Sequence, residues 1–188
     1  MAKKGLTKEH IVDMALEQIE AQGLSAFSLR TLSASLGVQV SSLYNHITGQ
    51  QELLTEVGLR AVDMLAQQEN DAIFGNEKEE AIYALADAYR RFAMEHRELY
   101  QIIMGVHILE IPVLEKAAQK IIEPILSVLS QYGINKETQI HYQRILRSIM
   151  HGFFAHETSG GFTAAVSKDS SYHLAISCVV NALKKEEL

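Results

Sequence analysis

Apolar residues recur every three or four positions along most of the chain, which is the spacing of one buried face on an α-helix. One face of the first such segment carries Ile11, Ala15, Leu16 and Ile19. Thr7 lies just before it and can accept a hydrogen bond from an unpaired amide, while Gly23 can end the helix. The pattern therefore predicts a first helix between Thr7 and Gly23.

A second helix is expected to begin after Ser28, because its apolar residues again fall at helical spacing. These residues are Leu29, Leu32 and Leu36. Gly37 can take the left-handed backbone conformation that a sharp turn requires.

A very short helix, from about residue 40 to residue 46, is expected after this turn. It is too short to be stable alone and depends on packing through Val40, Leu43 and Ile47. Two helices joined by a turn that contains glycine, with a preceding helix to support them, are typical of a helix-turn-helix unit.

Further segments with helical periodicity follow, and no strand-like alternation competes with them, so the fold class is all-α. They span about residues 50–68, 78–95, 97–105, 111–131, 136–157 and 166–185. The polar stretch 69–80 is the best candidate for a boundary, and Pro124 predicts a kink or a break. The paired glycines in 156–162 predict a loop.

The composition fits one or two globular domains, with 188 residues, of which 47% are hydrophobic and 21% are charged. No signal peptide is evident, and no apolar run reaches the ~18 residues that a membrane span needs. A single cysteine, Cys178, excludes an intrachain disulfide. We therefore expect a cytoplasmic protein without membrane association.

The formal net charge of −6 argues against indiscriminate coating of nucleic acid. Residues 1–60 carry five cationic and six anionic side chains, which leaves a net charge of −1 there. The cations of this segment are Lys3, Lys4, Lys8, Arg30 and Arg60.

The polar side of the short helix has the chemistry of a surface that reads a DNA duplex. Glutamine, serine and asparagine can hydrogen-bond to base edges, while Tyr44 and His46 can donate to phosphate oxygens. A solvated polar face on a small helical bundle would have the same composition, so from the residues alone the two interpretations stay open.

The segment "HIVDMALEQIEAQGLSAFSLRTLSASLGVQVSSLYNHITGQQELL" resembles the DNA-binding domain of the TetR family of transcriptional regulators, over about residues 6–56. The stretch "LRSIMHGFFAHETSGGF", residues 146–162, is similar to the C-terminal domain of one subgroup, which is marked by a His-Gly motif. The resemblance implies a homodimer with a helix-turn-helix domain at residues 1–50 and a larger effector-binding and dimerisation domain at residues 51–188. It also implies a repressor that a small molecule releases from a palindromic DNA operator.

Carried over residue by residue, the resemblance places Tyr44 and His46 at phosphate-contacting positions and Asn45 on the variable reading face. The full set of expected DNA-binding residues is Lys8, Arg30, Thr31, Gln39, Ser41, Ser42, Tyr44, Asn45, His46 and Gln50. Gln50 departs from the family, which commonly has a phosphate-binding lysine at this position. We therefore expect few phosphate contacts and a shallow dependence of DNA binding on salt.

Aromatic and methionine side chains cluster in the C-terminal part and suit a pocket for an apolar or aromatic effector. The expected effector-binding residues are Tyr89, Phe92, Tyr100, Met104, His107, Met150, His151 and Phe154. The same side chains at helical spacing are also typical of a core. The last two helices carry more apolar residues than one pair of helices needs, which favours dimerisation through them.

Catalysis has little support in the sequence, since there is no glycine-rich phosphate loop and no nucleophile paired with a base. The histidines lack the spacing of metal ligands, so we expect neither a metal nor a cofactor. One alternative function remains, a helical protein that binds small molecules and whose short helix contacts a protein partner instead of DNA.

Overall fold

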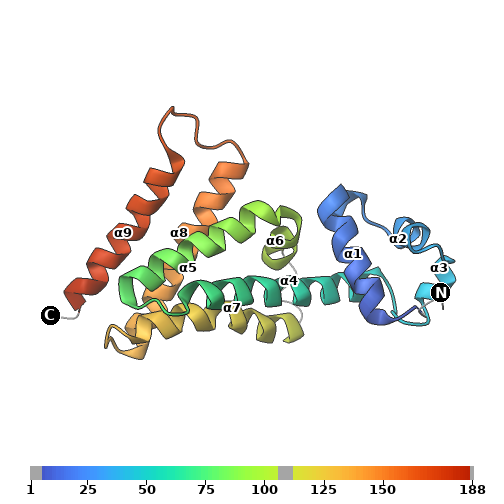
Figure 1. Ribbon diagram of the computed structural model, residues 1–188, viewed down its shortest axis with the longest axis horizontal. Helices are drawn as coiled ribbons and strands as arrows, with labels where there is room; N and C mark the ends of the chain where they lie inside the picture. Colours follow the sequence, from blue (N-terminus) through green and yellow to red (C-terminus); the bar gives the residue numbers. More distant parts are fainter. Residues whose placement is uncertain (1–5, 106–111, 187–188) are drawn as a thin grey trace. The chain divides into compact units, whose positions relative to one another are not determined.

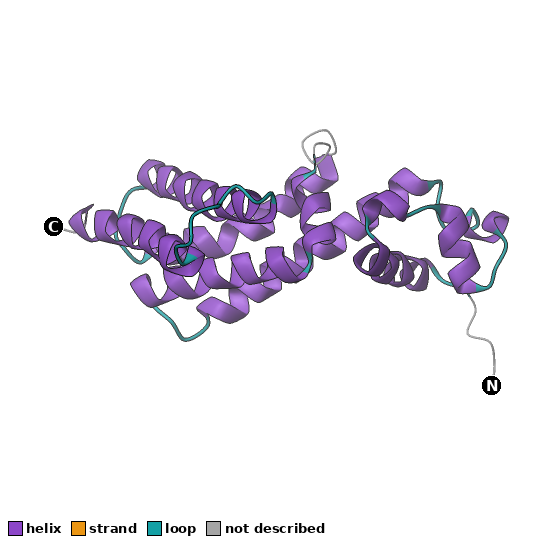
Figure 2. Ribbon diagram, turned by 90° about the horizontal axis from the view of Figure 1, so that it is seen from above, coloured by secondary structure: helices purple, strands orange, loops and turns teal. Residues whose placement is uncertain are grey.

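The computed structural model describes residues 6–105 and 112–186, and these residues form helices and connecting loops (Figures 1 and 2). The elements, in chain order, are α1 (Lys8–Gln22), the 3-10 turn η1 (Leu24–Ala26), α2 (Leu29–Leu36), α3 (Val40–Leu43), α4 (Gln50–Ile73), α5 (Lys78–Glu95), α6 (Arg97–Met104), α7 (Pro112–Ser130), α8 (Lys136–Thr158) and α9 (Lys168–Glu186). No strand occurs in the described ranges, which confirms the all-α prediction.

The elements pack into two compact groups. The first unit joins residues 1–63 with residues 96–117, and the second unit joins residues 64–95 with residues 118–188. Helices α4 and α7 each contain residues of both units. The functional division at residue 50 stays a prediction, because packing within one chain does not test it.

The first unit confirms the predicted start and end of α1. The Thr7 hydroxyl accepts a hydrogen bond from the His10 amide at 3.2 Å. Gly23 ends the helix with φ +86°, and its N–H donates to the Ile19 carbonyl at 2.9 Å. Ile11 and Ile19 are fully buried, as their spacing predicts.

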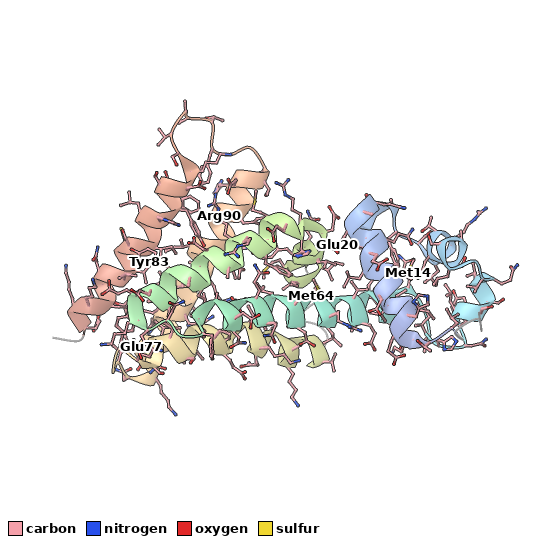
Figure 3. The ribbon with its side chains drawn as sticks, in the orientation of Figure 1. Met14, Glu20, Met64, Glu77, Tyr83 and Arg90 are labelled. Carbon is pink, nitrogen blue, oxygen red and sulfur yellow. The ribbon has the colours of Figure 1, made fainter. Side chains whose placement is uncertain are left out.

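Within the first unit, α6 packs on α1. The Leu24 N–H donates to a Glu98 carboxylate oxygen at 2.8 Å, which joins the first turn of α6 to the start of η1. Glu20 of α1 also contacts the ring of His96, the residue before α6 (Figure 3). The DNA-binding domain expected at residues 1–50 therefore shares its packing with a later helix.

In the second unit, α5, α8 and α9 pack against one another around Tyr172, which is fully buried. The Tyr172 hydroxyl donates to the Ala86 carbonyl at 2.6 Å, and burial, the largest cause, raises its pKa. Arg90 lies over the Tyr172 ring, 5.0 Å from its centroid (Figure 3). Arg90 also binds Glu157 of α8 and Asp169 of α9, so one guanidinium joins the three helices.

The ends predicted for α4 and α8 need correction, and of the kink or break predicted at Pro124 only the break is excluded. Helix α4 continues to Ile73 instead of ending at Gln68, and the side chains of Gln67 and Asn70 bond within the helix there. Helix α7 passes through Pro124 without a break. Helix α8 includes residues 156–158 of the expected loop, and the Thr158 hydroxyl donates to the Phe154 carbonyl at 2.8 Å.

Candidate nucleic-acid interface

The turn between α2 and α3 is fixed by hydrogen bonds at both ends of α2. Ser28 caps the first turn in a reciprocal pair with Thr31, in which the Thr31 amide donates to the Ser28 hydroxyl at 3.1 Å. Gly37 has φ +65°, and the Val38 N–H donates to the Ser33 carbonyl at 3.0 Å. This left-handed residue ends α2 and turns the chain sharply into α3.

Helix α3 is shorter than expected, since regular helix covers only Val40–Leu43 and residues 44–46 form a turn. The turn is held because the His46 and Ile47 amides both donate to the Leu43 carbonyl, at 2.9 and 3.0 Å. Leu43 is fully buried and Ile47 is 3% exposed. These two side chains are the packing anchors that the sequence predicts.

The opposite side of this segment faces solvent. Tyr44 is 56% exposed and Asn45 is also exposed, while His46 is partly exposed. Gln39 and Ser41 are exposed as well, and Ser42 is partly exposed. Six of the ten expected DNA-binding residues are therefore brought together on one accessible surface, which we call the reading face (Gln39, Ser41, Ser42, Tyr44, Asn45 and His46).

The other four expected DNA-binding residues have different surroundings. The Thr31 hydroxyl takes part in the capping of α2, where it donates to the Ser28 carbonyl at 2.8 Å. Arg30 and Gln50 are exposed. Lys8 is bound by carboxylates of its own chain, as described next.

Lys8 forms an ion pair with each of two carboxylates on α4. Its Nζ lies 2.7 Å from Glu52 Oε1 and 2.6 Å from Glu56 Oε1. The hydrogen bonds to Glu52 and Glu56 raise the pKa of Lys8. We call these three residues the Lys8 clamp, which joins the start of α1 to the first turns of α4.

Glu52 is the feature of this surface that the sequence-based prediction missed. Its Oε2 accepts hydrogen bonds from the Thr48 amide at 2.6 Å and from the Thr48 hydroxyl at 2.7 Å. The hydrogen bond from Lys8, followed by those from Thr48, lowers the pKa of Glu52 to about 2. The start of α4 thus holds a carboxylate that is bound by other groups of the same chain. The sequence did contain a signal for this contact, because a glutamate in the first turn of a helix can accept a hydrogen bond from a threonine just before the helix.

Acid titration tests the Lys8 clamp. The pKa of Glu52 is about 2 in the folded chain and 4.5 in an unfolded chain that lacks these contacts. The clamp therefore stabilises the fold above pH 4.5. This contribution is expected to disappear as the pH falls from 4.5 toward 2. Lys8→Met should lower the melting temperature at neutral pH and have a smaller effect at pH 3, as followed by circular dichroism. An equal loss at both values would contradict the assignment.

The expected effector-binding residues are divided between the two units. In the second unit, Tyr89 and Met150 are fully buried, and Phe92 and Phe154 are 1% and 6% exposed. His151 is exposed and does not join that interior. The first unit contains Tyr100, which is 1% exposed, and Met104, which is partly exposed. His107 lies outside the described residues.

A surface pocket of about 250 Å³ lies where the loop between α8 and α9 folds back. It is lined by Phe153, Gly161, Phe162, Thr163, Ala164, Val166, Lys168 and Ser171. The expected loop therefore forms one wall of a hollow. None of the eight expected effector-binding residues lines it.

Within the described part of the chain, no group of three or more possible ligand side chains is placed to hold a metal ion. The helices there also lack the length and apolar character that crossing a membrane would require.

Comparison with known proteins decides the family. Residues 11–64, which run from within α1 to within α4, match the family model for bacterial regulatory proteins of the tetR family, and residues 82–179 match the model for the tetracyclin repressor-like C-terminal domain. The chain belongs to the TetR family. It is a DNA-binding transcriptional regulator, and α2 and α3 lie within the matched residues 11–64.

Individual relatives of this TetR-family chain agree with the assignment. It is 34% identical over 155 residues to YobS, an uncharacterised HTH-type transcriptional regulator of Bacillus subtilis, covering 79% of this chain and 78% of YobS. A protein of unknown function from Rhodococcus has the same fold, with a TM-score of 0.83, 19% identity and coverage of 96% and 97% of the two chains. ActR of Streptomyces coelicolor in complex with (S)-DNPA gives a TM-score of 0.70, 20% identity and coverage of 98% and 100%.

Proposed function

We propose that this TetR-family chain is a homodimeric repressor that binds a near-palindromic operator and leaves it when a small apolar or aromatic effector binds. The observation that carries the proposal is the reading face, which is exposed on a helix fixed from behind by Leu43 and Ile47. A short second helix of this kind docks in the major groove. Residues 1–50 would bind the DNA, and residues 51–188 would bind the effector and the second subunit, in the bacterial cytoplasm.

Exposed apolar side chains on the last two helices support dimerisation. Ile140 and Ile145 of α8 are 43% and 46% exposed, and Leu174 of α9 is 66% exposed. Other apolar residues of the same helices, among them Leu146, Ile176 and Leu183, are buried within the second unit. Only the exposed part of this apolar surface is thus available for a dimer. A symmetric contact with the same helices of a second subunit would cover that part.

An effector-binding role is supported by the apolar interior of the second unit and by ActR, whose structure contains a small molecule. Two reading faces held by a dimer would meet half-sites roughly 34 Å apart, one helical turn of DNA. Selection of bound duplexes from a random pool tests the proposal directly. A palindromic consensus is expected, and equal retention of random and selected duplexes would point to a protein partner instead.

Substitutions on the reading face should distinguish residues that contact the phosphate backbone from residues that recognise bases. Tyr44→Phe removes one hydroxyl donor to a phosphate and is expected to weaken binding by about tenfold on every operator variant. Asn45→Ala should change the preferred base at one position of each half-site more than it changes overall affinity. Competition binding to a library of single-base operator variants measures both effects. Unchanged affinity in Tyr44→Phe at several salt concentrations would exclude the phosphate contact.

The dependence of operator binding on salt is expected to be shallow. Lys8 is held by two carboxylates, Arg60 pairs with Asp13 at 3.4 Å, and Gln50 carries no charge. Because each neutralised phosphate contributes nearly one unit to the slope of log affinity against log salt, few cations give a small slope. Titration of a selected operator between about 50 and 200 mM salt measures it. A slope typical of about ten phosphate contacts would contradict this prediction.

A further inference from the structure

One buried carboxyl group in the second unit has no hydrogen-bond partner among the described residues. The Glu69 side chain on α4 is 0% exposed, and neither of its oxygens has a hydrogen-bond partner among the residues that the structure describes. Its polar neighbours along α4 do have partners. Gln67 donates to Asp71 at 2.7 Å, and Asn70 donates to the Ala66 carbonyl at 2.8 Å. Glu69 is therefore a specific exception on its helix.

Glu69 ends the buried stripe of α4, after Val62, Leu65 and Ala66. A residue at this position would pack best as leucine or alanine, because an unpaired carboxylate loses its hydration without compensation. Burial raises the pKa of Glu69 well above 4.5, and the charge of Arg147 on α8 opposes this rise only in part. A buried carboxyl group that lowers the stability of the fold in this way is typical of a binding site.

The helices beside Glu69 contribute apolar and aromatic side chains to the interior of the second unit. The Gln68 side chain donates to the Ala88 carbonyl at 3.1 Å, so α4 lies beside α5 at this level. The influence of Arg147 on Glu69 brings α8 near the same point. The buried faces of α5 and α8 carry Leu85, Tyr89, Phe92, Leu146, Met150 and Phe154. Four of these are residues expected from the sequence to bind an effector.

A small molecule that enters the interior could supply the partner that Glu69 lacks among the described residues. A second subunit or a peptide docked on the surface cannot reach a side chain that is 0% exposed. The only charge in the protein found to act on Glu69 within the described residues is that of Arg147, which forms no hydrogen bond with it. The site thus offers one acceptor group within an apolar setting, which suits a ligand with one cationic end.

We propose that Glu69 anchors the ammonium group of an effector that is an amine with an aromatic or apolar body. The inference depends on the proposed function only in treating the second unit as the effector-binding part. The protonated amine keeps its proton and pairs with the Glu69 carboxylate. Burial favours the protonated form of Glu69 before binding, and any proton that it holds passes to the solvent when the amine binds.

Isothermal titration calorimetry of the full chain tests this with 2-phenylethylamine and 4-phenylbutylamine, with 2-phenylethanol and phenylacetate as neutral and anionic controls. Titration near pH 7 in buffers of different ionisation enthalpy gives the number of protons released. We expect the amines to bind with release of protons, and the two controls to bind more weakly. Glu69→Gln should weaken amine binding by about tenfold or more and abolish the release. Glu123→Gln, which removes an exposed carboxylate from α7, should change neither.

Thermal unfolding provides a second measurement that does not need the ligand. Glu69→Leu is expected to raise the melting temperature, because it replaces an unpaired buried carboxyl with an apolar side chain. If Glu69→Leu and Glu69→Gln both melt below the wild type, Glu69 has a structural partner and the proposal is wrong.

Three binding results would also overturn the proposal: no amine binding to the wild type, equal amine binding by Glu69→Gln, or tighter binding of phenylacetate than of the amines. Selected operator DNA separates this failure from failure of the proposed function. If the wild type binds the operator and a non-amine compound releases it, only the role of Glu69 is refuted.

Discussion

Replacing Arg90 with methionine is expected to lower the free energy of unfolding of the second unit by about 3 kcal/mol. The Arg90 guanidinium binds both oxygens of Glu157, at 2.9 to 3.1 Å, and lies 2.8 Å from Asp169. Burial disfavours charge on Arg90, but the hydrogen bonds of Asp169 and Glu157 outweigh burial and raise its pKa. The Glu157 side chain is only 11% exposed, so removal of Arg90 leaves a largely buried carboxylate without its partner. Urea denaturation followed by circular dichroism measures the loss.

A neighbouring arginine provides the matched control for this experiment. Arg91 is exposed, so Arg91→Met makes the same chemical change and should alter stability by less than about 0.5 kcal/mol. The double variant of Arg90→Met with Glu157→Leu should recover part of the loss, because no carboxylate is then left unpaired. A single variant that loses less than about 1 kcal/mol would show that solvent replaces the arginine, as at surface ion pairs.

Leu43→Ala is expected to destabilise the first unit by about 3 kcal/mol and to abolish operator binding. Leu43 is fully buried, and regular α3 is only four residues long, so this side chain is the main anchor of the reading face. The truncation leaves a cavity beneath a helix that has no stability of its own. Amide hydrogen exchange at His46 and Ile47, whose N–H groups donate to the Leu43 carbonyl, reports the local opening.

Tyr44→Ala is the control for Leu43→Ala, because Tyr44 is the adjacent residue and is 56% exposed. It should weaken operator binding without changing amide exchange or the melting temperature. The two variants thus distinguish loss of the scaffold from loss of a contact. If Leu43→Ala keeps wild-type exchange rates, packing through Leu43 does not fix the reading face.

The elements of the fold follow from the sequence wherever a helix has its own start and stop residues. Thr7 and Gly23 bound α1, and Ser28 and Gly37 bound α2, because each makes a local hydrogen bond or takes a special backbone conformation. The end of α4 was predicted too early, since asparagine and aspartate are typical of turns. At Asn70 and Asp71 their side chains bond within the helix instead.

The candidate site was predictable where it depends on neighbouring residues and not where it depends on distant ones. Exposure of Tyr44 and burial of Leu43 follow from helical spacing within a short segment. The binding of Lys8 by Glu52 and Glu56 joins residues more than forty positions apart, and spacing carries no signal for it. Glu69 illustrates the same limit, because polar residues in a polar stretch predict solvent exposure, whereas its side chain is buried.

The Lys8 clamp has a consequence for how such a repressor would find its operator in a cell. Attraction to phosphates regardless of sequence holds most DNA-binding proteins on the chromosome and lets them slide along it. With Lys8 bound internally and a glutamate at the start of α4, this attraction is expected to be weak. Most copies would then be free in solution, the search would depend on three-dimensional diffusion, and a small number of molecules would suffice to occupy one site.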